Sequence, residues 1–465
     1  MVTAPPSPLN IAILAAGQGK RMRSGLPKVL HPLGGRPLLA HVLDTARKLA
    51  ADRICVVYGH GGEAVRGRFP EPDLAWALQD PPQGTGHALA KALPQLAAEG
   101  VTLVLFGADP LARPATLESV VRHARAGALS LLTIELDDPT GYGRIVRGPD
   151  GAVTAIIEHK DATPEQRAIR EINTGVMAAP TACFARWLKA IDNRNASGEY
   201  YLTDVITLAR KEGVAIETSR AGSVLETLGV NTMRELAQLE RLYQRAQADA
   251  LLDAGVTLAD PDRIDVRGAL ACGADVMIDV GCVFEGTVRL GDGVSIGANC
   301  VLKDVTVEAG SQVLPFSHLE GAAIGANCRV GPYARLRPGA TLADDVHIGN
   351  FVEVKASSIG RGSKANHLAY VGDTTMGAGV NFGAGSITAN YDGANKHRTV
   401  IGDDASIGSN CVLVAPVTIG RGATIGGGST IAKEAPAETL TVSRARQVSL
   451  PGWKRPVKQP KPPKG

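Results

Sequence analysis

Hydrophobic and polar residues follow one kind of pattern over the first half of the chain. From residue 10 to about 230, short apolar runs alternate with segments in which apolar residues recur every three or four positions. The runs predict strands and the recurrence predicts helices, so this part is expected to be an α/β sheet of parallel type with crossover helices. Strands are predicted over residues 11–16, 53–59, 102–107 and 129–136, and a helix over 38–50.

The pattern changes at residues 232–252, where neither Gly nor Pro interrupts a run with apolar residues at helical spacing. This run predicts a long amphipathic helix that connects two domains. Its apolar positions are Met233, Leu236, Leu239, Tyr243, Ala246 and Ala250.

From about residue 260 the apolar positions recur every six residues, and a Gly often follows them. Neither a helix nor a flat sheet has this period. Hexapeptide repeats predict a β-helix, in which each repeat supplies one short strand and a turn, and three repeats form one coil. The aliphatic side chain points inward, and Gly suits a turn where positive φ is needed. The series are Ile278, Phe284, Leu290, Ile296 and Leu302; Ile324, Val330, Leu336, Leu342, Ile348 and Val354; and Ile401, Ile407, Leu413, Ile419, Ile425 and Ile431.

Two segments, residues 355–372 and 387–399, are expected to break the repeat. The second is too polar for a coil and predicts an extruded loop, and interruptions of a solenoid are where functional residues gather. Three cysteines each lie four residues after an inward aliphatic residue, so they are expected to be small buried hydrophobic residues. They are Cys300, Cys328 and Cys411.

Composition limits the possible classes of protein. A chain of 465 residues is too long for one core, and its net charge of +3 is ordinary. No apolar run reaches the roughly 20 residues that cross a bilayer, and the first residues do not resemble a secretory signal, so no membrane insertion is expected. Seven cysteines without a Cys-x-x-Cys pair favour a reducing, cytoplasmic location. The Lys- and Pro-rich tail is expected to be flexible and solvated rather than bound to nucleic acid.

The first apolar run leads into the segment LAAGQGKRM at residues 14–22. Met22 stands where a dinucleotide-binding fingerprint needs its third Gly, and the Gly-Lys-Ser/Thr of an ATP-binding P-loop is absent. A strand, a turn of small residues and the cations Lys20, Arg21 and Lys28 suit a polyphosphate. Taken alone, the segment also fits a Gly-rich turn with surface cations.

With LPKVL at residues 26–30, this segment resembles the signature of sugar-nucleotide pyrophosphorylases. Further matching motifs are QGTGHA (83–88), DDPTGYGRI (137–145), IIEHKDAT (156–163), EINTGV (171–176), GEYYLTD (198–204) and GVNT (229–232). Together with the hexapeptide half, residues 10–457 resemble the bacterial family of bifunctional N-acetylglucosamine-1-phosphate uridyltransferases/glucosamine-1-phosphate N-acetyltransferases. The resemblance implies a Rossmann-like nucleotidyltransferase domain at 1–231, a linker helix at 232–252 and a left-handed parallel β-helix at 253–465.

The resemblance also implies two reactions. The C-terminal domain would transfer an acetyl group from acetyl-CoA to glucosamine-1-phosphate. The N-terminal domain would join the product to UTP with the help of Mg²⁺ and release pyrophosphate. The resulting UDP-N-acetylglucosamine would supply peptidoglycan and lipopolysaccharide precursors. A homotrimer packed through the repeat is expected, with small-molecule substrates and no nucleic acid.

In the N-terminal domain, the resemblance assigns residues to the nucleotide, the phosphates and the N-acetylglucosamine. The implied residues are Leu14, Ala15, Gly17, Lys28, Gln79, Gly84, Thr85, Phe106, Gly107, Gly143, Glu158, Asn173 and Asn231. One position departs from the family pattern Gly-Asp-Val-Pro, in which the Asp binds Mg²⁺ together with Asn231. Here Ala108 holds that place and Asp109 follows one residue later. A slip of one residue reverses the face in a regular strand, whereas a bend before Pro110 would let Asp109 reach the ion, and the sequence leaves both outcomes open.

In the C-terminal domain, the resemblance makes His367 the general base, a role that suits an imidazole near neutral pH. The residues implied for the sugar phosphate are Arg337, Lys355, Tyr370 and Asn381. Those implied for acetyl-CoA are Asn390, Tyr391, Ser409, Gly427 and Arg444. Gly427 replaces a family Ala, and Ala389 replaces a family Cys beside the site, so reduced sensitivity to thiol reagents is expected.

The sequence leaves two alternatives open. The β-helix could serve only for oligomerisation, although the polar segment NYDGANKHRT and the pair His367 and Tyr370 argue against this. Alternatively, uridyltransfer could be impaired by the Ala108–Asp109 departure, so that only the acetyltransferase half is active.

Overall fold

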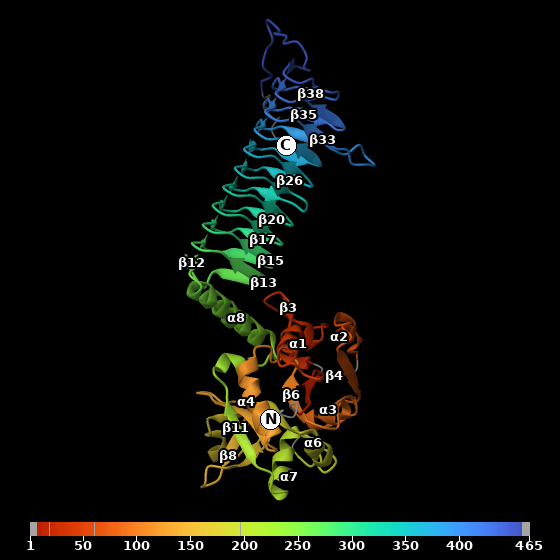
Figure 1. Ribbon diagram of the computed structural model, residues 1–465, viewed down its shortest axis with the longest axis vertical. Coiled ribbons are helices and arrows are strands. Elements are labelled where there is room, and N and C mark those ends of the chain that lie inside the picture. The colour runs from red at the N-terminus through yellow and green to blue at the C-terminus, as the bar shows by residue number, and fades with distance from the viewer. Residues whose placement is uncertain (1–6, 18, 60, 196, 458–465) are drawn as a thin grey trace, which may run out of the picture. The chain divides into compact units, whose positions relative to one another are not determined.

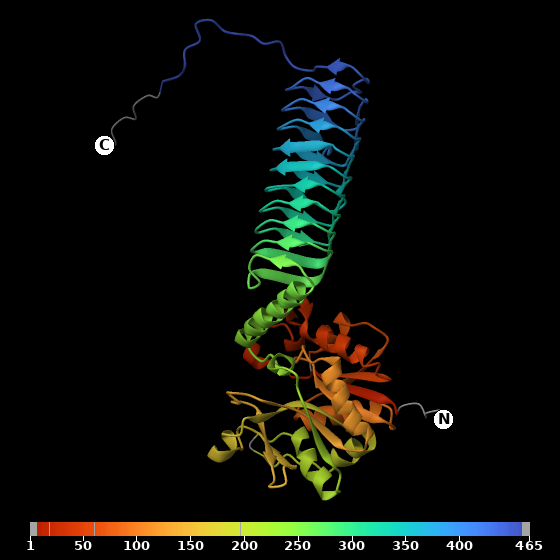
Figure 2. The same cartoon turned by 60° about the vertical axis from the view of Figure 1, so that its left-hand side comes forward.

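The structure is a computed structural model that describes residues 7–17, 19–59, 61–195 and 197–457. It divides into two compact units, Met1–Gln247 and Ala248–Gly465, and the division falls inside the long helix α8 (Met233–Asp253). This helix confirms the amphipathic run that the sequence predicts at 232–252. Figures 1 and 2 show the elements of each unit coloured along the chain.

The N-terminal unit is built on a sheet with the strand order β11-β7-β10-β6-β1-β4-β5. The strands around β1 are parallel, but β10 runs antiparallel to both of its neighbours, β6 and β7. The expectation of a parallel-type sheet is therefore wrong at β10. The strands of this sheet are β1 (Leu9–Leu14), β4 (Arg53–Gly59), β5 (Leu74–Gln79), β6 (Val101–Phe106), β7 (Leu129–Glu135), β8 (Gly143–Arg147), β9 (Val153–Ile157), β10 (Glu171–Pro180) and β11 (Ile216–Arg220), while β2 (Pro32–Leu33) and β3 (Arg36–Pro37) pair with each other in a separate sheet.

Both faces of this sheet are buried. On β1, Ile11 and Ile13 pack into one apolar cluster, whereas Ala12 and Leu14 pack into another. Burial on both faces explains why the predicted strands are continuous apolar runs rather than alternating ones. The remaining α-helices are α1 (Leu38–Lys48), α2 (Glu63–Arg68), α3 (Thr85–Ala92), α4 (Pro114–Arg125), α5 (Pro164–Arg167), α6 (Thr181–Trp187) and α7 (Val205–Lys211). The 3₁₀ turns are η1 (Lys20–Met22), η2 (Lys28–Leu30), η3 (Leu93–Gln95), η4 (Leu202–Asp204) and η5 (Val224–Thr227).

The C-terminal unit is a parallel β-helix whose coils stack along one axis (Figure 2). Its inward aliphatic residues form one continuous core, so the six-residue period and the predicted fold class are confirmed. One column of strands is β12 (Thr257–Leu258), β14 (Met277–Ile278), β16 (Ser295–Ile296), β19 (Gln312–Val313), β22 (Arg329–Val330), β25 (His347–Asn350), β28 (Lys364–His367), β31 (Asn381–Phe382), β34 (Ser406–Ile407), β37 (Thr424–Ile425) and β39 (Leu440–Thr441).

The other strands of the β-helix join in a second sheet. They are β13 (Ile264–Cys272), β15 (Cys282–Leu290), β17 (Val301–Lys303), β18 (Thr306–Val307), β20 (His318–Glu320), β21 (Ala323–Ile324), β23 (Arg335–Leu336), β24 (Thr341–Leu342), β26 (Glu353–Lys355), β27 (Ser358–Ile359), β29 (Tyr370–Gly372), β30 (Thr374–Met376), β32 (Ile387–Ala389), β33 (Thr399–Ile401), β35 (Val412–Val414), β36 (Val417–Ile419) and β38 (Thr430–Ile431).

The repeat continues through residues 355–372, so the interruption expected there is wrong. Strands β27 to β29 occupy this segment, and Ile359, Ala365 and Val371 fill the inward positions at six-residue spacing. Some coils close after 17 residues, as between Asn350 and His367, rather than 18, as between Ala326 and Asp344. The missing residue shifts the phase, and Ala365 holds an inward position with a side chain too small to mark the period.

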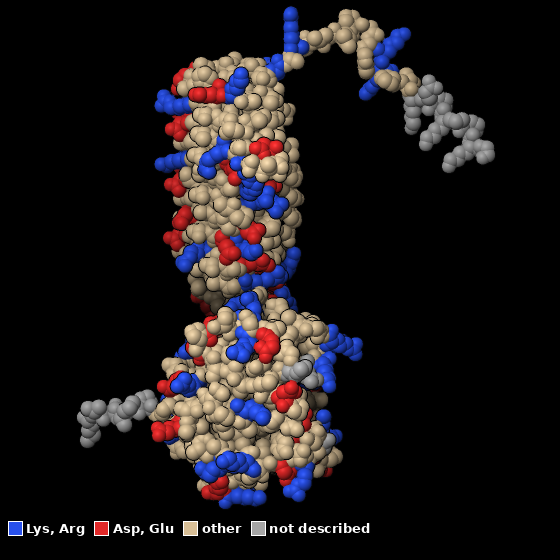
Figure 3. Space-filling model, turned by 90° about the vertical axis from the view of Figure 1, so that its right-hand side faces the viewer, with Lys and Arg blue, Asp and Glu red and all other residues tan. Residues whose placement is uncertain are grey.

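The second interruption is confirmed, with narrower bounds. Residues 390–398 leave the β-helix between β32 and β33, and paired residues across this loop, such as Ser386 and Cys411, are 25 apart. Cys300, Cys328 and Cys411 are buried, as predicted. Within the described chain, no helix has the length and apolar character needed to span a membrane. Figure 3 shows acidic and basic side chains interspersed on the face in view, the usual pattern of a mixed protein surface.

Candidate active sites

The carboxyl ends of β1 and β6 open into a pocket of the N-terminal unit. Leu14 and Phe106, the last residues of these paired strands, lie in register and both line it. Predicted residues from many segments of the unit meet here: Leu14, Ala15, Gly17, Lys28, Gln79, Gly84, Thr85, Phe106, Asp109, Gly143, Glu158, Asn173 and Asn231. Gly107 is the exception among the predicted binding residues. It packs behind the lining, where its N–H donates to the Leu14 carbonyl at 3.0 Å.

The three predicted phosphate-binding cations occupy different places. Lys28 lines the pocket, whereas Arg21 lines a neighbouring hollow that shares Gly229 and Asn231 with it. Lys20 is exposed and lines neither hollow. The segment that begins at Lys20 forms only the single 3₁₀ turn η1, so an extended helix N-terminus does not contribute to anion binding here.

The start of α8 holds Asn231 in the pocket. Thr232 Oγ1 accepts a hydrogen bond from the Glu235 N–H, while the Glu235 carboxylate accepts from the N–H groups of Thr232 and Asn231. This reciprocal capping fixes the backbone at the helix entry. Asn231 Oδ1 then accepts a hydrogen bond of 3.2 Å from Lys28 Nζ. Burial lowers the pKa of Lys28, and the Asp109 carboxylate opposes that shift.

Asp109 lies beside these two residues at the end of β6. Its carboxylate packs so closely against Gly229 that a Cβ there would lie 2.3 Å from Oδ1, so a larger residue at 229 would force the Asp109 side chain to move. Burial raises the pKa of Asp109 to about 7, against the attraction of Lys28. Ala108 also lines the pocket, but its methyl group has no ligand atom. The bend before Pro110 therefore brings Asp109 into the pocket that contains Asn231.

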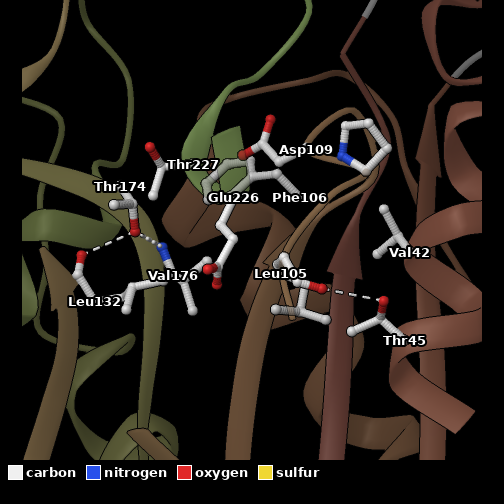
Figure 4. A pocket seen from close by; sticks show the side chains of 12 residues that line it. Val42, Thr45, Leu105, Phe106, Asp109, Leu132, Thr174, Val176, Glu226 and Thr227 are labelled. Atoms are coloured by element: carbon white, nitrogen blue, oxygen red, sulfur yellow. Dashed lines mark hydrogen bonds between the residues drawn. The ribbon is translucent and has the colours of Figure 1, made fainter. Parts of the chain in front are cut away.

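A second buried carboxyl group, Glu226, lies near Asp109 on the wall of a small cavity (Figure 4). In Figure 4 the two carboxyl groups point in opposite directions. Glu226 Oε2 accepts a hydrogen bond of 2.6 Å from Thr116 Oγ1. Glu226 is thus engaged within the fold, and Asp109 is the carboxylate that accompanies Asn231.

The residues predicted to bind the sugar gather at another part of the pocket. Gly143 on β8 pairs with Asn173 on β10, at the point where β10 shifts its register with β7. Glu158 lies beside Gly143, and Thr203 Oγ1 donates to its Oε1 at 3.5 Å. Burial raises the pKa of Glu158. Glu158, Asn173 and Gly143 therefore line the same part of the pocket.

In the C-terminal unit, His367 is exposed at the end of β28. Its Nδ1 lies 2.8 Å from Oδ1 of Asn350, one coil earlier. Because an amide oxygen can only accept, Nδ1 carries the hydrogen and Nε2 keeps its lone pair. A neutral imidazole held in this tautomer can take a proton at Nε2.

A cluster of cations and polar groups lies on neighbouring coils. Lys355 Nζ lies 3.5 Å from Oδ2 of Asp373, and Asn390 Nδ2 donates both to that carboxylate and to the Tyr370 hydroxyl. Arg337 donates to Glu353 at 2.7 Å, and Glu353 is in register with Tyr370. The extruded loop adds Lys396, whose pKa is lowered by the hydrogen bond and like charge of Lys355.

Sequence reasoning missed four members of these groups: Asn350, Glu353, Asp373 and Lys396. Two of them could have been found from register. Asn350 and Glu353 stand one 17-residue coil before His367 and Tyr370. Asp373 follows Gly372, the register partner of Lys355, so register alone does not identify it. Lys396 lies in the loop, where register carries no information.

Of the remaining predicted residues, Ser409, Gly427 and Arg444 form a group of their own, whereas Tyr391 adjoins the cluster through Lys396. Arg444 Nη1 donates to the Gly427 carbonyl at 2.7 Å, and a Cβ on Gly427 would lie 3.4 Å from the Ser409 carbonyl oxygen, so these three form a second group. Asn381 is exposed in the strand column of His367, in register with Lys364. Tyr391 is exposed in the loop and bridges to Lys396.

Comparison with known proteins connects both units to described families. The model of the MobA-like NTP transferase domain matches residues 11–194. In the other unit, the GMPPB C-terminal domain matches residues 266–365, and the bacterial transferase hexapeptide (six repeats) matches 398–433.

Full-length relatives extend this similarity over nearly the whole chain. A bifunctional protein GlmU of Chromobacterium violaceum is 61% identical over 451 residues, which are 97% of this chain and 99% of that protein. One of Nitrosospira multiformis is 58% identical over 457 residues (98% and 99%), and one of Azoarcus sp. is 60% identical over 451 residues (97% and 100%). The chain belongs to the family of bifunctional GlmU proteins.

Proposed function

We propose that this chain carries out two successive transfers that make UDP-N-acetylglucosamine. The C-terminal unit acetylates glucosamine-1-phosphate with acetyl-CoA, and the N-terminal unit joins the N-acetylated sugar phosphate to UTP and releases pyrophosphate. The observation that carries the proposal is the similarity to bifunctional GlmU proteins over 97–98% of the chain. The alternative, in which only one half is active, has no support from these relatives.

For acetyl transfer, we assign the role of general base to His367. The substrate amine attacks the thioester carbonyl carbon, His367 Nε2 takes the proton that the nitrogen must lose, and the CoA thiolate leaves. Asn350 orients the imidazole through Nδ1 at 2.8 Å. Arg337, Lys355 and Lys396 approach one another and suit the sugar phosphate, with Tyr370 and Asn381 toward the sugar. Asn390, Tyr391, Ser409, Gly427 and Arg444 are assigned to acetyl-CoA.

For uridyl transfer, a phosphate oxygen of N-acetylglucosamine-1-phosphate attacks the α-phosphorus of UTP, and pyrophosphate leaves. The backbone of Leu14, Ala15 and Gly17 approaches the nucleotide, Gln79, Gly84 and Thr85 read the base and ribose, and Lys28 neutralises phosphate charge. Gly143, Glu158 and Asn173 hold the sugar. Phe106 and Gly107 support the nucleotide from the end of β6.

The proposed metal ion is Mg²⁺, with Asp109 and Asn231 as its protein ligands. One carboxylate and one amide oxygen, both lining the pocket, are the hard donors that Mg²⁺ takes when substrate phosphates complete its shell. When bound, the ion would neutralise the charge that develops on the phosphate oxygens. Asn231 Oδ1 and Asp109 also interact with Lys28, so the protein already pairs these oxygens with a cation.

The proposal is tested by two assays on one preparation of the full chain. Thiol release from acetyl-CoA should depend on glucosamine-1-phosphate, and pyrophosphate release from UTP should depend on N-acetylglucosamine-1-phosphate. A chelator should stop the second reaction and leave the first unchanged. Absence of either reaction in the folded protein would contradict the bifunctional assignment.

We further propose that the chain acts as a homotrimer in the cytoplasm. The predicted acetyltransferase residues fall into separate groups within one chain, which supports a site completed by a neighbouring copy. Sedimentation equilibrium would measure the mass of the assembly.

A further inference from the structure

The side-chain amide of Gln79 has both of its hydrogens committed inside the N-terminal unit. Gln79 ends β5 and is only 3% exposed, yet it lines the nucleotide pocket. Its Nε2 donates to the Gly84 carbonyl at 2.9 Å and lies 3.2 Å from Nδ1 of His87. The Gly84 carbonyl can only accept, so the atom beside it must be the amide nitrogen.

The Oε1 atom of Gln79 is thereby left available. Among the described residues, none donates a hydrogen bond to it. An amide held in this way presents only an acceptor to whatever binds in the pocket.

His87 acts on this amide from outside the pocket. It lies on α3, does not belong to the pocket lining, and packs its ring against Tyr200 with the centroids 6.4 Å apart. Burial and the neighbouring Lys91 lower the pKa of His87, so its ring is neutral near pH 7. A neutral ring whose hydrogen is on Nε2 can accept from Gln79 at Nδ1.

The direction of the Gln79 amide matters for the choice between pyrimidine bases. Uracil offers an N–H donor at N3, whereas cytosine offers a lone pair there and an amino group at C4. A fixed acceptor complements the uracil N3–H and faces the cytosine lone pair unfavourably. A site that reads such a difference through a buried polar group discriminates strongly, because the wrong partner leaves that group unpaired.

We propose that His87 is a positioning residue for base selection, which accepts the second Nε2 hydrogen of Gln79 and so keeps the amide carbonyl available to uracil and not to cytosine. The inference rests on the proposed function in one respect, namely that this pocket binds a uridine nucleotide. It adds a residue, His87, that acts only through Gln79 and need not touch the nucleotide.

The test is equilibrium binding of UTP and of CTP to the full chain, measured by isothermal titration calorimetry with Mg²⁺ present. Two substitutions remove the ring and differ in one respect. His87→Asn keeps an acceptor near the place of Nδ1, whereas His87→Leu has none. We expect His87→Leu to reduce the preference for UTP over CTP about five- to tenfold, the range of one lost hydrogen bond, and His87→Asn to stay within about twofold of the unaltered chain.

Two further variants act as controls. Gln79→Ala should reduce the preference at least as much as His87→Leu, since it removes the reading group itself. Lys91→Ala removes the charge one helical turn from His87 and leaves the acceptor in place, so its preference should be unchanged. Circular dichroism on each variant confirms that the unit is folded.

An unchanged preference in His87→Leu would overturn the inference, even if both nucleotides bound more weakly. Equal losses in His87→Asn and His87→Leu would also overturn it, because the ring rather than its acceptor would then matter. Turnover is measured separately. A chain that prefers UTP in the predicted way but forms no UDP-N-acetylglucosamine would refute the proposed function and leave the role of His87 standing.

Discussion

The two candidate sites are assembled by different means. The pocket of the N-terminal unit collects residues from Leu14 to Asn231, brought together where strands of one sheet end and where α8 begins. The site of the β-helix collects residues one coil apart, such as Asn350 with His367 and Glu353 with Tyr370. The side chains of the first site are placed by the packing of a whole domain. Those of the second site are placed by a repeat of 17 or 18 residues.

This difference determines how each site tolerates a change in sequence. A coil that is one residue shorter still places its strands in register, because the next coil stacks on it directly. At the end of β6, by contrast, Ala108 stands where the resemblance implies a carboxylate, and the proposed ligand role passes to Asp109. The β-helix site should therefore be robust to local shifts, and the sheet-end pocket should depend on one turn.

The largest effect we expect falls on one of the two reactions and leaves the other unchanged. His367→Ala removes the atom that takes the amine proton, so acetyl transfer should fall about 1,000-fold while uridyl transfer stays within twofold. Both rates are measured on the same preparation, by thiol release and by pyrophosphate release. His318→Ala, at an exposed His on β20, serves as the control and should change neither rate. Near-normal acetylation by the His367 variant would refute the assignment.

The second prediction examines the turn at the end of β6. Asp109→Ala should lower uridyl transfer about 100-fold, equivalent to about 3 kcal/mol of lost charge stabilisation, and leave acetyl transfer unchanged. Glu226→Gln alters the other carboxyl group of the same cavity, which is bonded to Thr116, and should have little effect on the rate. Magnesium titrations of both variants give the metal dependence directly.

A companion variant tests whether the position or only the carboxylate matters. The double change Ala108→Asp with Asp109→Ala moves the acid back by one residue, to the position of the family pattern. We expect it to recover most of the activity that Asp109→Ala loses. Full activity in Asp109→Ala alone would show that this carboxylate is not the ligand.

The same contrast explains which elements could be predicted from the sequence and which could not. Strand β4 coincides with the predicted 53–59, because a fully buried parallel strand is a plain apolar run. Strand β10 escaped prediction, because Asn173, Thr174 and Gly175 interrupt its apolar residues at the point where it supplies the pocket. Residues that line the pocket therefore occupy positions where a regular buried strand would have apolar side chains.

In the β-helix, a regular segment was predicted to be irregular. The period of six identified the fold, but Ala365 and a shorter coil concealed the repeat at 355–372, so this segment was interpreted as an interruption. The site residues there were identified through family resemblance rather than periodicity. The partner of His367, Asn350, follows from the coil register once the coil lengths are known. Asp373, the partner of Lys355, lies one residue beyond the register position.

A third prediction concerns one of these register partners. Asn350→Leu removes the acceptor for His367 Nδ1, so the imidazole loses its preferred tautomer and orientation. We expect kcat for acetyl transfer to fall about tenfold, the equivalent of about 1.4 kcal/mol, with little change in KM for glucosamine-1-phosphate. Asn350→Asp keeps an acceptor oxygen and should retain most of kcat. An equal loss in both variants would mean that Asn350 acts on the coil rather than on His367.

The smallest effect we expect is the response to a thiol reagent. Cysteines in the β-helix core are buried, and burial raises the pKa of Cys300 to about 12, so the reactive thiolate is scarce. Ala389, where the resemblance implies a family Cys, ends β32 beside Asn390 and offers no thiol at the proposed site. Alkylation of the native chain should therefore change acetyl transfer less than twofold, as measured by product formation after removal of the reagent. The variant Ala389→Cys supplies the matched comparison: it should become sensitive, since its thiol would lie next to a residue of the proposed cofactor site. If the unaltered chain lost acetyl transfer on alkylation, and mass spectrometry placed the label on a cysteine of the β-helix core, then the coils would open far more readily than their close stacking implies.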